Sequence, residues 1–268
     1  MSQLLPDIKL PDVIEEIDYE ALLDDTEQHL RDESGLDIEF IESDPVTMAN
    51  ESLVYREMLL RARINESARA AYLFTATDND LKNIAAGRGV VLLDGESDER
   101  LRYRIYLALY SFSTAGAAKS YEYYALTVST DILQARCLGP KDGTAPGTVE
   151  IVYHSDSDFT DDILAACNDE TVVPLCDTPL VTRAEVLNVD ITIDTLKLED
   201  GYTIADTRTR IEEAFYALNS AILIGDDVSK SRIYDTASVD GVIKVTHDQD
   251  DDVIATARQI IQFNIIFI

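Results

Sequence analysis

Apolar residues follow two different spacings along the chain, and the change between them falls near residue 129. Before it, apolar residues recur every three to four positions, which is the period of an amphipathic helix. This spacing predicts helices over residues 17–31, 44–75, 80–86, 98–110 and 117–128. Beyond it, apolar residues alternate with polar ones, as at Val189, Ile191 and Ile193, and this alternation predicts strands.

The second half of the chain combines strands with helices. We expect strands over 132–137, 148–153, 241–246 and 259–268, and helices over 159–167, 204–218 and 229–237. A long β-rich stretch over 180–198 holds the last strand of the first α+β subdomain and the first strand of the second. These elements do not alternate as those of a doubly wound parallel sheet would. The sequence therefore predicts an α+β protein in which an N-terminal helical region with long helices precedes two small mixed α+β subdomains. The expected divisions are an acidic extended arm with the first amphipathic helix (1–43), a helical core or bundle region (44–129), and α+β subdomains over 130–187 and 188–268.

The second expected helix is unusual in its length and in its apolar residues. Asp44 is a suitable N-cap, Pro45 suits the first turn, and about 30 residues follow without Gly or Pro, which would span roughly 45 Å. The apolar residues occupy several faces of this helix, so we expect it to be buried on several sides, by its own chain or by partner chains. The residues most expected in a shared helix bundle are Leu53, Val54, Met58, Leu60 and Ile64.

Arginines gather on the same helix, at Arg56, Arg61, Arg63 and Arg69. A later helix carries a second group, Arg100, Arg102 and Arg104. Arginine suits interfacial ion pairs because its planar fork holds a carboxylate through two hydrogen bonds. We therefore expect pairs with acidic partner chains, or, with equal weight, pairs with the acidic first helix of the same chain.

Charge excludes several classes of partner. The 268 residues include 22 Lys and Arg against 51 Asp and Glu, a formal net charge of -29. A nucleic-acid binder needs a basic face, and so does a protein that docks on anionic lipid. No run of apolar residues is long enough to span a membrane, and the acidic, proline-broken N-terminus does not resemble a signal peptide. Three cysteines without a CxxC motif indicate reduced thiols in a product of the cytoplasm.

Catalytic and metal-binding signatures are missing. The three histidines lie in different segments, and no GxSxG, HExxH, P-loop or GxGxxG motif is present. Asp248, Asp250 and Asp252 fit the start of a calcium loop, but Val253 and Gln259 stand where that loop needs Gly and Glu. We therefore expect no enzyme, no metal site and no cofactor. Two alternatives stay open: a hydrolase of cell-envelope polymer that uses paired carboxylates in the C-terminal half, and a free acidic scaffold or chaperone.

Several motifs at fixed spacing resemble the baseplate J family of contractile-tailed phages and related contractile injection particles. The segment over residues 55–90 carries Arg61, Arg63, Asn65, Glu66, Ala68, Arg69, Ala70, Asp80 and Leu81. The segment over residues 98–126 carries Asp98, Leu101, Arg102, Arg104, Ile105, Ser113, Ala115, Gly116 and Tyr121. Residues 11–23, 145–154, 172–186 and 231–245 are similar to further parts of the family, although Leu175 and the inserted Thr178-Pro179 depart from its pattern.

The resemblance implies a structural wedge subunit of a tail baseplate, without catalysis. It implies a heterotrimeric helical bundle with a second copy of the chain and a different baseplate wedge protein. It also implies contacts with neighbouring wedges, which join into a ring around the hub, and with sheath-initiator and hub proteins, but with no nucleic acid or membrane. The expected location is the virion tail baseplate, assembled in the host cytoplasm, and the expected action is a baseplate rearrangement that triggers sheath contraction.

Overall fold

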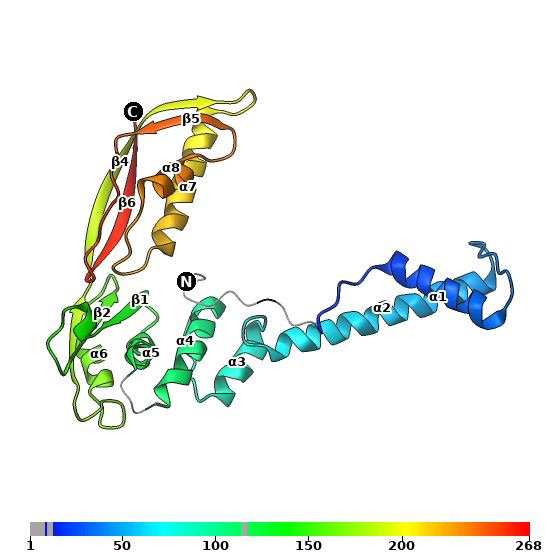
Figure 1. Cartoon of the computed structure of the whole chain (residues 1–268), viewed down its shortest axis with the longest axis horizontal. Coiled ribbons are helices and arrows are strands. Elements are labelled where there is room, and N and C mark those ends of the chain that lie inside the picture. The colour runs from blue at the N-terminus through cyan, green and yellow to red at the C-terminus, as the bar shows by residue number, and fades with distance from the viewer. Residues whose placement is uncertain (1–8, 10–12, 114–116) are drawn as a thin grey trace. The chain divides into compact units, whose positions relative to one another are not determined.

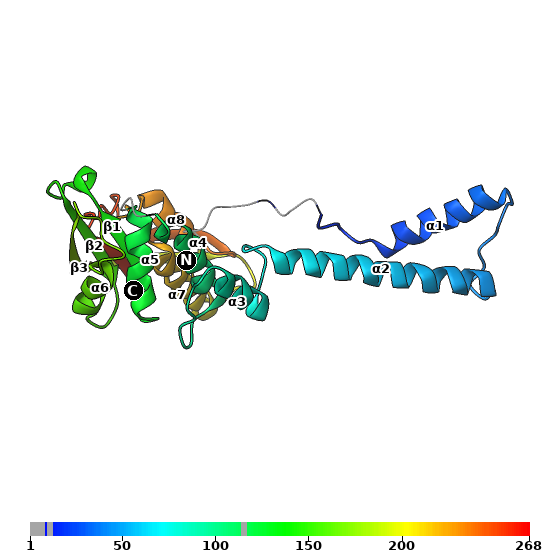
Figure 2. The same ribbon diagram turned by 90° about the horizontal axis from the view of Figure 1, so that it is seen from below.

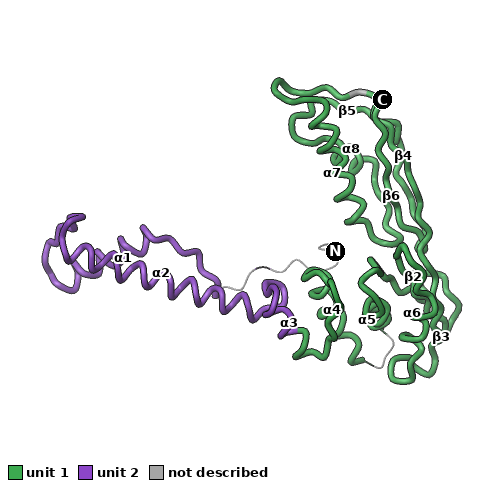
Figure 3. The backbone as a smooth tube through the Cα atoms, turned by 180° about the vertical axis from the view of Figure 1, so that it is seen from behind, with its two compact units in different colours: residues 1–5, 85–268 green, residues 6–84 purple. Residues whose placement is uncertain are grey.

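The computed structural model describes residues 9, 13–113 and 117–268, together with the side chains of these residues except Thr195 (Figure 1). The described residues form two compact units, divided between residues 84 and 85 (Figure 3). The N-terminal one, purple and labelled unit 2 in Figure 3, is called the first unit below, and the green one, labelled unit 1, is called the second. Long helices occupy the N-terminal part, and two mixed sheets with helices follow, so the expected α+β class is confirmed. Most of the expected N-terminal arm, as well as Ala115 and Gly116 of the turn motif, lies outside the described residues.

The first unit contains two antiparallel helices that lie side by side (Figure 2). Helix α1 spans Tyr19–Ser34 and α2 spans Pro45–Ala71. The Asp18 side chain caps α1 by accepting hydrogen bonds from the amides of residues 20 and 21, and Gly35 ends that helix at a φ of 63°. Asp44 caps α2 by accepting from the amide of residue 46, and Pro45 fills its first position as expected.

Helix α2 is shorter than the sequence predicts. It ends at Ala71 rather than near residue 75, because Tyr72 adopts an extended backbone conformation. The hydroxyl of Thr75 then donates to the carbonyl of Arg69 at 2.6 Å, which satisfies an acceptor in the last turn of the helix. Propensity alone does not show this end, because the residues beyond it include neither Gly nor Pro.

Three further helices lead from the first unit into the second. They are α3 (Asp78–Gly87), which includes the boundary between the units, α4 (Asp98–Ser111) and α5 (Ala118–Val128). The Ser97 side chain accepts from the amide of Arg100 and so caps α4. Helices α4 and α5 pack against each other, and Leu101, Ile105 and Leu126 are buried there.

The first sheet has β2 at its centre. Strand β1 (Gln134–Leu138) is antiparallel to β2 (Thr148–His154), whereas β3 (Thr178–Arg183) is parallel to it. A short 3-10 turn, η2 (Pro140–Asp142), lies between β1 and β2. Helix α6 (Thr160–Cys167) lies in the connection between β2 and β3, as the parallel pairing requires.

The second sheet has β4 (Glu185–Leu198) at its centre. Strand β5 (Val242–His247) is antiparallel to β4, and β6 (Gln259–Phe267) is parallel to it. Helices α7 (Ile204–Ala221) and α8 (Lys230–Ala237) cover one face of this sheet (Figure 1).

The β-rich stretch over 180–198 forms two strands in different sheets, as the expected order of strands and helices requires. The amide of Ala184 donates to the carbonyl of Tyr153 in the first sheet, at 2.7 Å. The next amide, of Glu185, donates to the carbonyl of Arg258 just before β6, at 3.0 Å. The chain thus passes from one sheet to the other at Ala184, a position that the sequence does not mark because the residues on both sides of it favour extended structure.

The two sheets share one apolar core. Leu138 and Val152 of the first sheet belong to the same buried cluster as Ile191, Ile211 and Phe215 of the second. Both expected α+β subdomains therefore contribute side chains to a continuous interior, which makes relative movement of the two sheets costly.

Two amide side chains strengthen this arrangement by pairing with extended backbone. Gln134 of β1 donates to the carbonyl of Ile222 at 2.7 Å and accepts from the amide of Ile224 at 3.1 Å. Asn219 of α7 donates to the carbonyl of Phe263 and accepts from its amide, each at 2.9 Å. Each amide thus satisfies a donor and an acceptor of a segment that is distant in sequence.

No helix in the described part of the chain is long and apolar enough to cross a membrane.

Candidate assembly surface on the helical unit

Helix α2 carries one buried stripe, which faces α1 and the segment before it. Its buried residues are Thr47, Asn50, Val54 and Asn65. The spacing of three, four and eleven residues places these side chains on one side of the helix. Val54 is 1% exposed, and Met58, one turn further, is half-buried.

Polar contacts fix the position of α2 within the unit. Asn65 donates to the carbonyl of Glu15 at 2.8 Å and accepts from its amide at 3.1 Å. Near the other end of the helix, Asn50 donates to the hydroxyl of Thr26 at 3.3 Å. Helix α1 itself has no fully buried residue, so it covers α2 only in part.

Large apolar side chains remain exposed on two other stripes of α2. The Leu60 stripe consists of Val46, Leu53, Leu60 and Ile64. The Tyr55 stripe consists of Met48, Tyr55 and Leu59. Leu53 is 67% exposed, Leu60 66% and Ile64 57%. Scattered exposed leucines are ordinary, but rows of them along one helix mark a surface that another molecule covers.

The four arginines of α2 have different surroundings. Arg61 forms ion pairs with Glu57 at 2.8 Å and with Glu15 at 2.9 Å. The hydrogen bonds to Glu57 and Glu15, in that order of effect, raise the pKa of Arg61. Arg63 lies 3.4 Å from Glu66 in an exposed pair. Arg56 and Arg69 are exposed, and neither forms an ion pair within the described part of the chain.

Of the nine residues expected at an interface, the structure thus leaves six exposed, whereas Val54, Met58 and Arg61 contact their own unit or lie half-buried in it. The exposed six are Leu53, Arg56, Leu60, Arg63, Ile64 and Arg69. Their contact with another chain remains a prediction.

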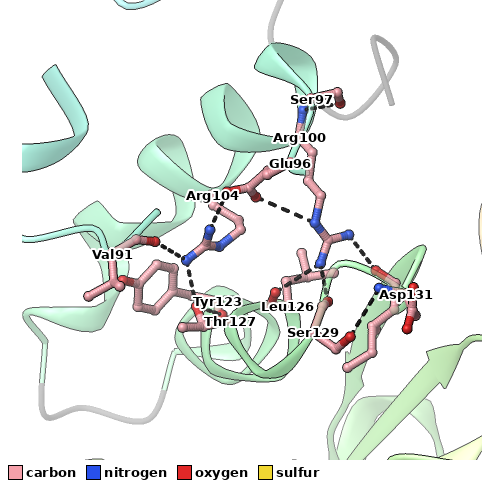
Figure 4. A network of polar contacts seen from close by, with 11 residues as sticks. Val91, Glu96, Ser97, Arg100, Arg104, Tyr123, Leu126, Thr127, Ser129 and Asp131 are labelled. Atoms are coloured by element: carbon pink, nitrogen blue, oxygen red, sulfur yellow. Dashed lines mark hydrogen bonds and ion pairs between the residues drawn. The ribbon is translucent and has the colours of Figure 1, made fainter. Parts of the chain in front are cut away.

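The arginines of α4 have a different role from the one that the sequence suggests. Arg104 is fully buried, and its Nη1 lies 2.6 Å from Glu96 Oε2 (Figure 4). Its Nη2 donates to the carbonyl of Val91 at 3.0 Å and to the hydroxyl of Thr127 at 3.4 Å. The expectation of a partner chain is therefore wrong for this residue, because its carboxylate lies eight residues earlier in the same chain.

Arg100 holds the end of α5. Its Nε lies 3.4 Å from Glu96 Oε1 (Figure 4). Its Nη2 donates to the carbonyls of Leu126 at 2.9 Å and Ser129 at 2.6 Å, and its Nη1 donates to the carbonyl of Ile132. These carbonyls belong to the last turn of α5 and the loop after it, where backbone acceptors need partners. Burial lowers the pKa of Arg100, and the charge of Glu96 opposes that effect.

The aspartates of the expected calcium-loop template serve the fold locally. Asp248 accepts from the amide of Thr192 at 2.8 Å. Asp250 forms an ion pair with Lys230 at 3.1 Å, and Asp252 accepts from the amide of the same residue at 2.8 Å. Over the described residues, no group of three or more His, Cys, Asp or Glu side chains is arranged to hold a metal ion.

Cys137, which is half-buried, and Cys167, which is buried, are poor nucleophiles. Burial raises the pKa of Cys137 and of Cys167 to about 12, so both are thiols at neutral pH. The exposed apolar stripes of α2 therefore remain the strongest candidate for a functional surface.

Comparison with known proteins gives the decisive observation. Residues 42–93, which include all of α2, match the baseplate J-like N-terminal domain. The chain is also 28% identical to baseplate protein J of Escherichia phage P2, over 90% of this chain and 88% of that protein. Residues 42–93 are thus similar to the N-terminal domain of the baseplate J family. The similarity to this family that the sequence motifs predict is thereby confirmed.

A solved structure, the baseplate of the anti-feeding prophage, contains a chain that is 10% identical, with a TM-score of 0.44. The match covers 63% of our chain and 42% of the prophage chain, so our chain spans less than half of that protein. The match to baseplate protein J supports a structural role in a phage tail baseplate, which is the role and location that the sequence predicts.

Proposed function

We propose that this chain is a wedge subunit that forms a heterotrimeric helical bundle with a second copy of itself and a different wedge protein. The α+β part then joins neighbouring wedges into a ring around the hub and contacts sheath-initiator proteins. A rearrangement of this ring triggers contraction of the sheath. The baseplate J-like domain over α2 and the surface of that helix support the proposal.

The observation that carries the proposal is the position of the two exposed stripes on α2. Successive residues of a helix are separated by about 100°, because 3.6 residues make one turn. The Leu60 stripe therefore lies about 90° to one side of Val54, and the Tyr55 stripe lies about 120° to its other side. With α1 on the buried stripe, two separate apolar surfaces remain for partners.

A trimer supplies the number of partners that these surfaces need. In a three-chain bundle each α2 has two neighbouring helices, one for each exposed stripe. A dimer would leave one of the stripes in water. Arg56 and Arg63, seven residues apart on the remaining face, would lie between the two neighbours, where carboxylates of those chains can reach them.

The proposed mechanical action needs rigid bodies and alternative interfaces. The shared core of the two sheets supplies a rigid body, whereas partner-covered stripes of a helix can slide between discrete packings. In this scheme the ring keeps one arrangement until a signal arrives, and the bundle interfaces then repack.

Native mass spectrometry tests the proposal. The chain is measured alone and after co-expression with the proteins encoded next to it. We expect a complex of two copies with one different chain, and self-association or poor solubility of the chain alone. A well-behaved monomer that binds none of its neighbours would contradict the wedge role, because both stripes would then be stable in water.

A further inference from the structure

A small, partly open cavity of about 230 Å³ lies within the second unit. Side chains from α4, α5 and β1 and from the segment after α7 line it. Its polar groups are Tyr103, Glu122, Gln134, Arg136 and Asp226. A cavity with apolar walls and a few convergent polar groups is the ordinary form of a binding pocket in proteins.

Glu122 is the unusual group in this cavity. Its carboxylate accepts one hydrogen bond, from the amide of Cys137 at 3.2 Å, and no ion pair with it is found in the described part of the chain. Burial raises the pKa of Glu122 to about 7, against the lowering effects of the Cys137 amide, Lys119 and Arg136. Carboxylates removed from water are normally held by a hydrogen-bonded cation, and the half-buried Glu122 has none among the described residues.

The cations nearest to Glu122 are engaged elsewhere. The Lys119 ammonium donates to the Tyr106 hydroxyl at 2.9 Å and lies over the ring of Tyr110. The Arg136 guanidinium donates to the carbonyl of Ile224 at 2.5 Å. Both cations therefore act on Glu122 through their charge, and neither donates a hydrogen bond to its carboxylate among the contacts of the described residues.

The remaining lining suits an aliphatic chain that ends in a positive charge. Leu133, Ala135 and Leu223 supply apolar walls, and Leu133 is itself about half exposed. Among the residues that line the cavity, the two carboxylates of Glu122 and Asp226 outweigh the single charge of Arg136 when Glu122 is ionised, and Lys119 lies outside this lining. An anion would be repelled, and an uncharged apolar group would leave Glu122 without a partner.

We propose that this cavity receives the lysine side chain of another protein chain, with its ammonium at Glu122 and its methylene groups along Leu133 and Leu223. Lysine fits better than arginine because the Cys137 amide already occupies one position on the carboxylate. A compact ammonium needs only one further acceptor, whereas a guanidinium binds best through two parallel hydrogen bonds. The proposal goes beyond the wedge role and does not depend on it.

The test uses n-butylammonium, which reproduces the end of a lysine side chain, with the purified full-length chain. Titration of the Glu122 carboxyl carbon is followed by NMR with ¹³C-labelled glutamate, with and without the amine at constant ionic strength. We expect n-butylammonium to lower the pKa of Glu122, because the bound cation favours the carboxylate. We also expect binding about tenfold tighter than that of methylammonium, which cannot reach the apolar walls.

Two comparisons decide the assignment. Glu122→Gln keeps the shape of the side chain and its acceptor for Cys137, and we expect it to weaken n-butylammonium binding about tenfold or more. Glu99→Gln, on the exposed side of α4, is the matched control and should leave binding unchanged. Equal effects of n-butylammonium, methylammonium and sodium on the pKa of Glu122 would overturn the proposal, since they would reflect screening alone. Tighter binding of n-propylguanidinium than of n-butylammonium would overturn the choice of lysine.

Discussion

The carboxylate of Glu150 on β2 accepts two hydrogen bonds from the guanidinium of Arg258, which lies 108 residues later in the chain. The Nε and Nη2 distances are 2.8 Å and 2.6 Å, and the hydroxyl of Thr182 donates to the same carboxylate at 2.9 Å. This pair connects the first sheet to the start of β6. The hydrogen bonds from Arg258 hold the pKa of Glu150 below its usual value.

The first prediction concerns the pH dependence of this pair. A carboxyl group whose pKa is lowered by folding adds stability above its unfolded pKa, and that stability is lost as pH falls through the folded pKa. We therefore expect Arg258→Ala to lower the melting temperature at pH 7 and to have little effect in strong acid, where Glu150 is protonated. A double-mutant cycle with Glu150→Gln measures the coupling, and a coupling that does not change with pH would contradict the prediction.

The second prediction concerns Glu96, which lies between two buried arginines. Glu96→Gln keeps the shape of the side chain but leaves the charges of Arg100 and Arg104 without a carboxylate. Breaking a buried pair in this way costs about 3–5 kcal/mol, because a charge stays in the interior without compensation. Chemical denaturation measures the loss. Glu99→Gln, on the exposed surface of the first turn of α4, should cost less than about 1 kcal/mol.

The third prediction concerns Glu122, whose pKa folding raises rather than lowers. Between the unfolded value of 4.5 and the folded value of about 7, the folded chain binds more protons than the unfolded chain. The contribution of Glu122 to the free energy of unfolding is therefore fully present below the unfolded pKa. It is lost as pH rises through the folded pKa, and the total loss is about 3 kcal/mol. Glu122→Gln should remove this loss. The measurement is the difference in unfolding free energy between wild type and variant from pH 4 to pH 8.5, and a constant difference would show that burial does not penalise the charge.

The fourth prediction separates the two kinds of apolar residue on α2. Leu60→Asp should leave the fold of the isolated chain intact, because the side chain already lies in water, but should prevent assembly with partner chains. Val54→Asp places a charge in the buried stripe and should destabilise the helical unit by more than about 3 kcal/mol. Circular dichroism reports the fold, and native mass spectrometry reports assembly. Normal assembly of Leu60→Asp would remove Leu60 from the bundle.

Features of the fold that depend on neighbouring residues can be predicted from the sequence. The cap at Asp44 and Pro45 follows from residue types at one helix end, and the periodic apolar residues locate α4 and α7 within a few positions. Features that depend on a hydrogen-bond partner distant in sequence cannot, and one such feature is the position, Ala184, at which the extended chain passes from one sheet to the other. No local signal marks that position, because both flanking segments are equally favourable for strands.

The arginines show the same limit for the candidate site. Arg63 and Arg104 look alike in sequence, since both are helical arginines close to glutamates. Arg104 is buried because Val91 and Thr127 enclose it, and neither contact can be read from its own helix. The family motif contains both residues but does not distinguish one that maintains the fold from one that faces solvent.

Three contacts between distant segments are hydrogen bonds from uncharged side-chain amides to backbone groups. They join Asn65 to Glu15, Gln134 to the segment after α7, and Asn219 to β6. Side-chain amides carry no net charge, so dissolved salt does not screen their hydrogen bonds as it screens ion pairs. In a chain of charge -29, changes in salt strongly alter repulsion at the surface. These hydrogen bonds therefore change little with salt, whereas the ion pair of Arg61 with Glu15 beside the first of them weakens as salt rises, so the amides keep the segments in place over a wide range of ionic strength.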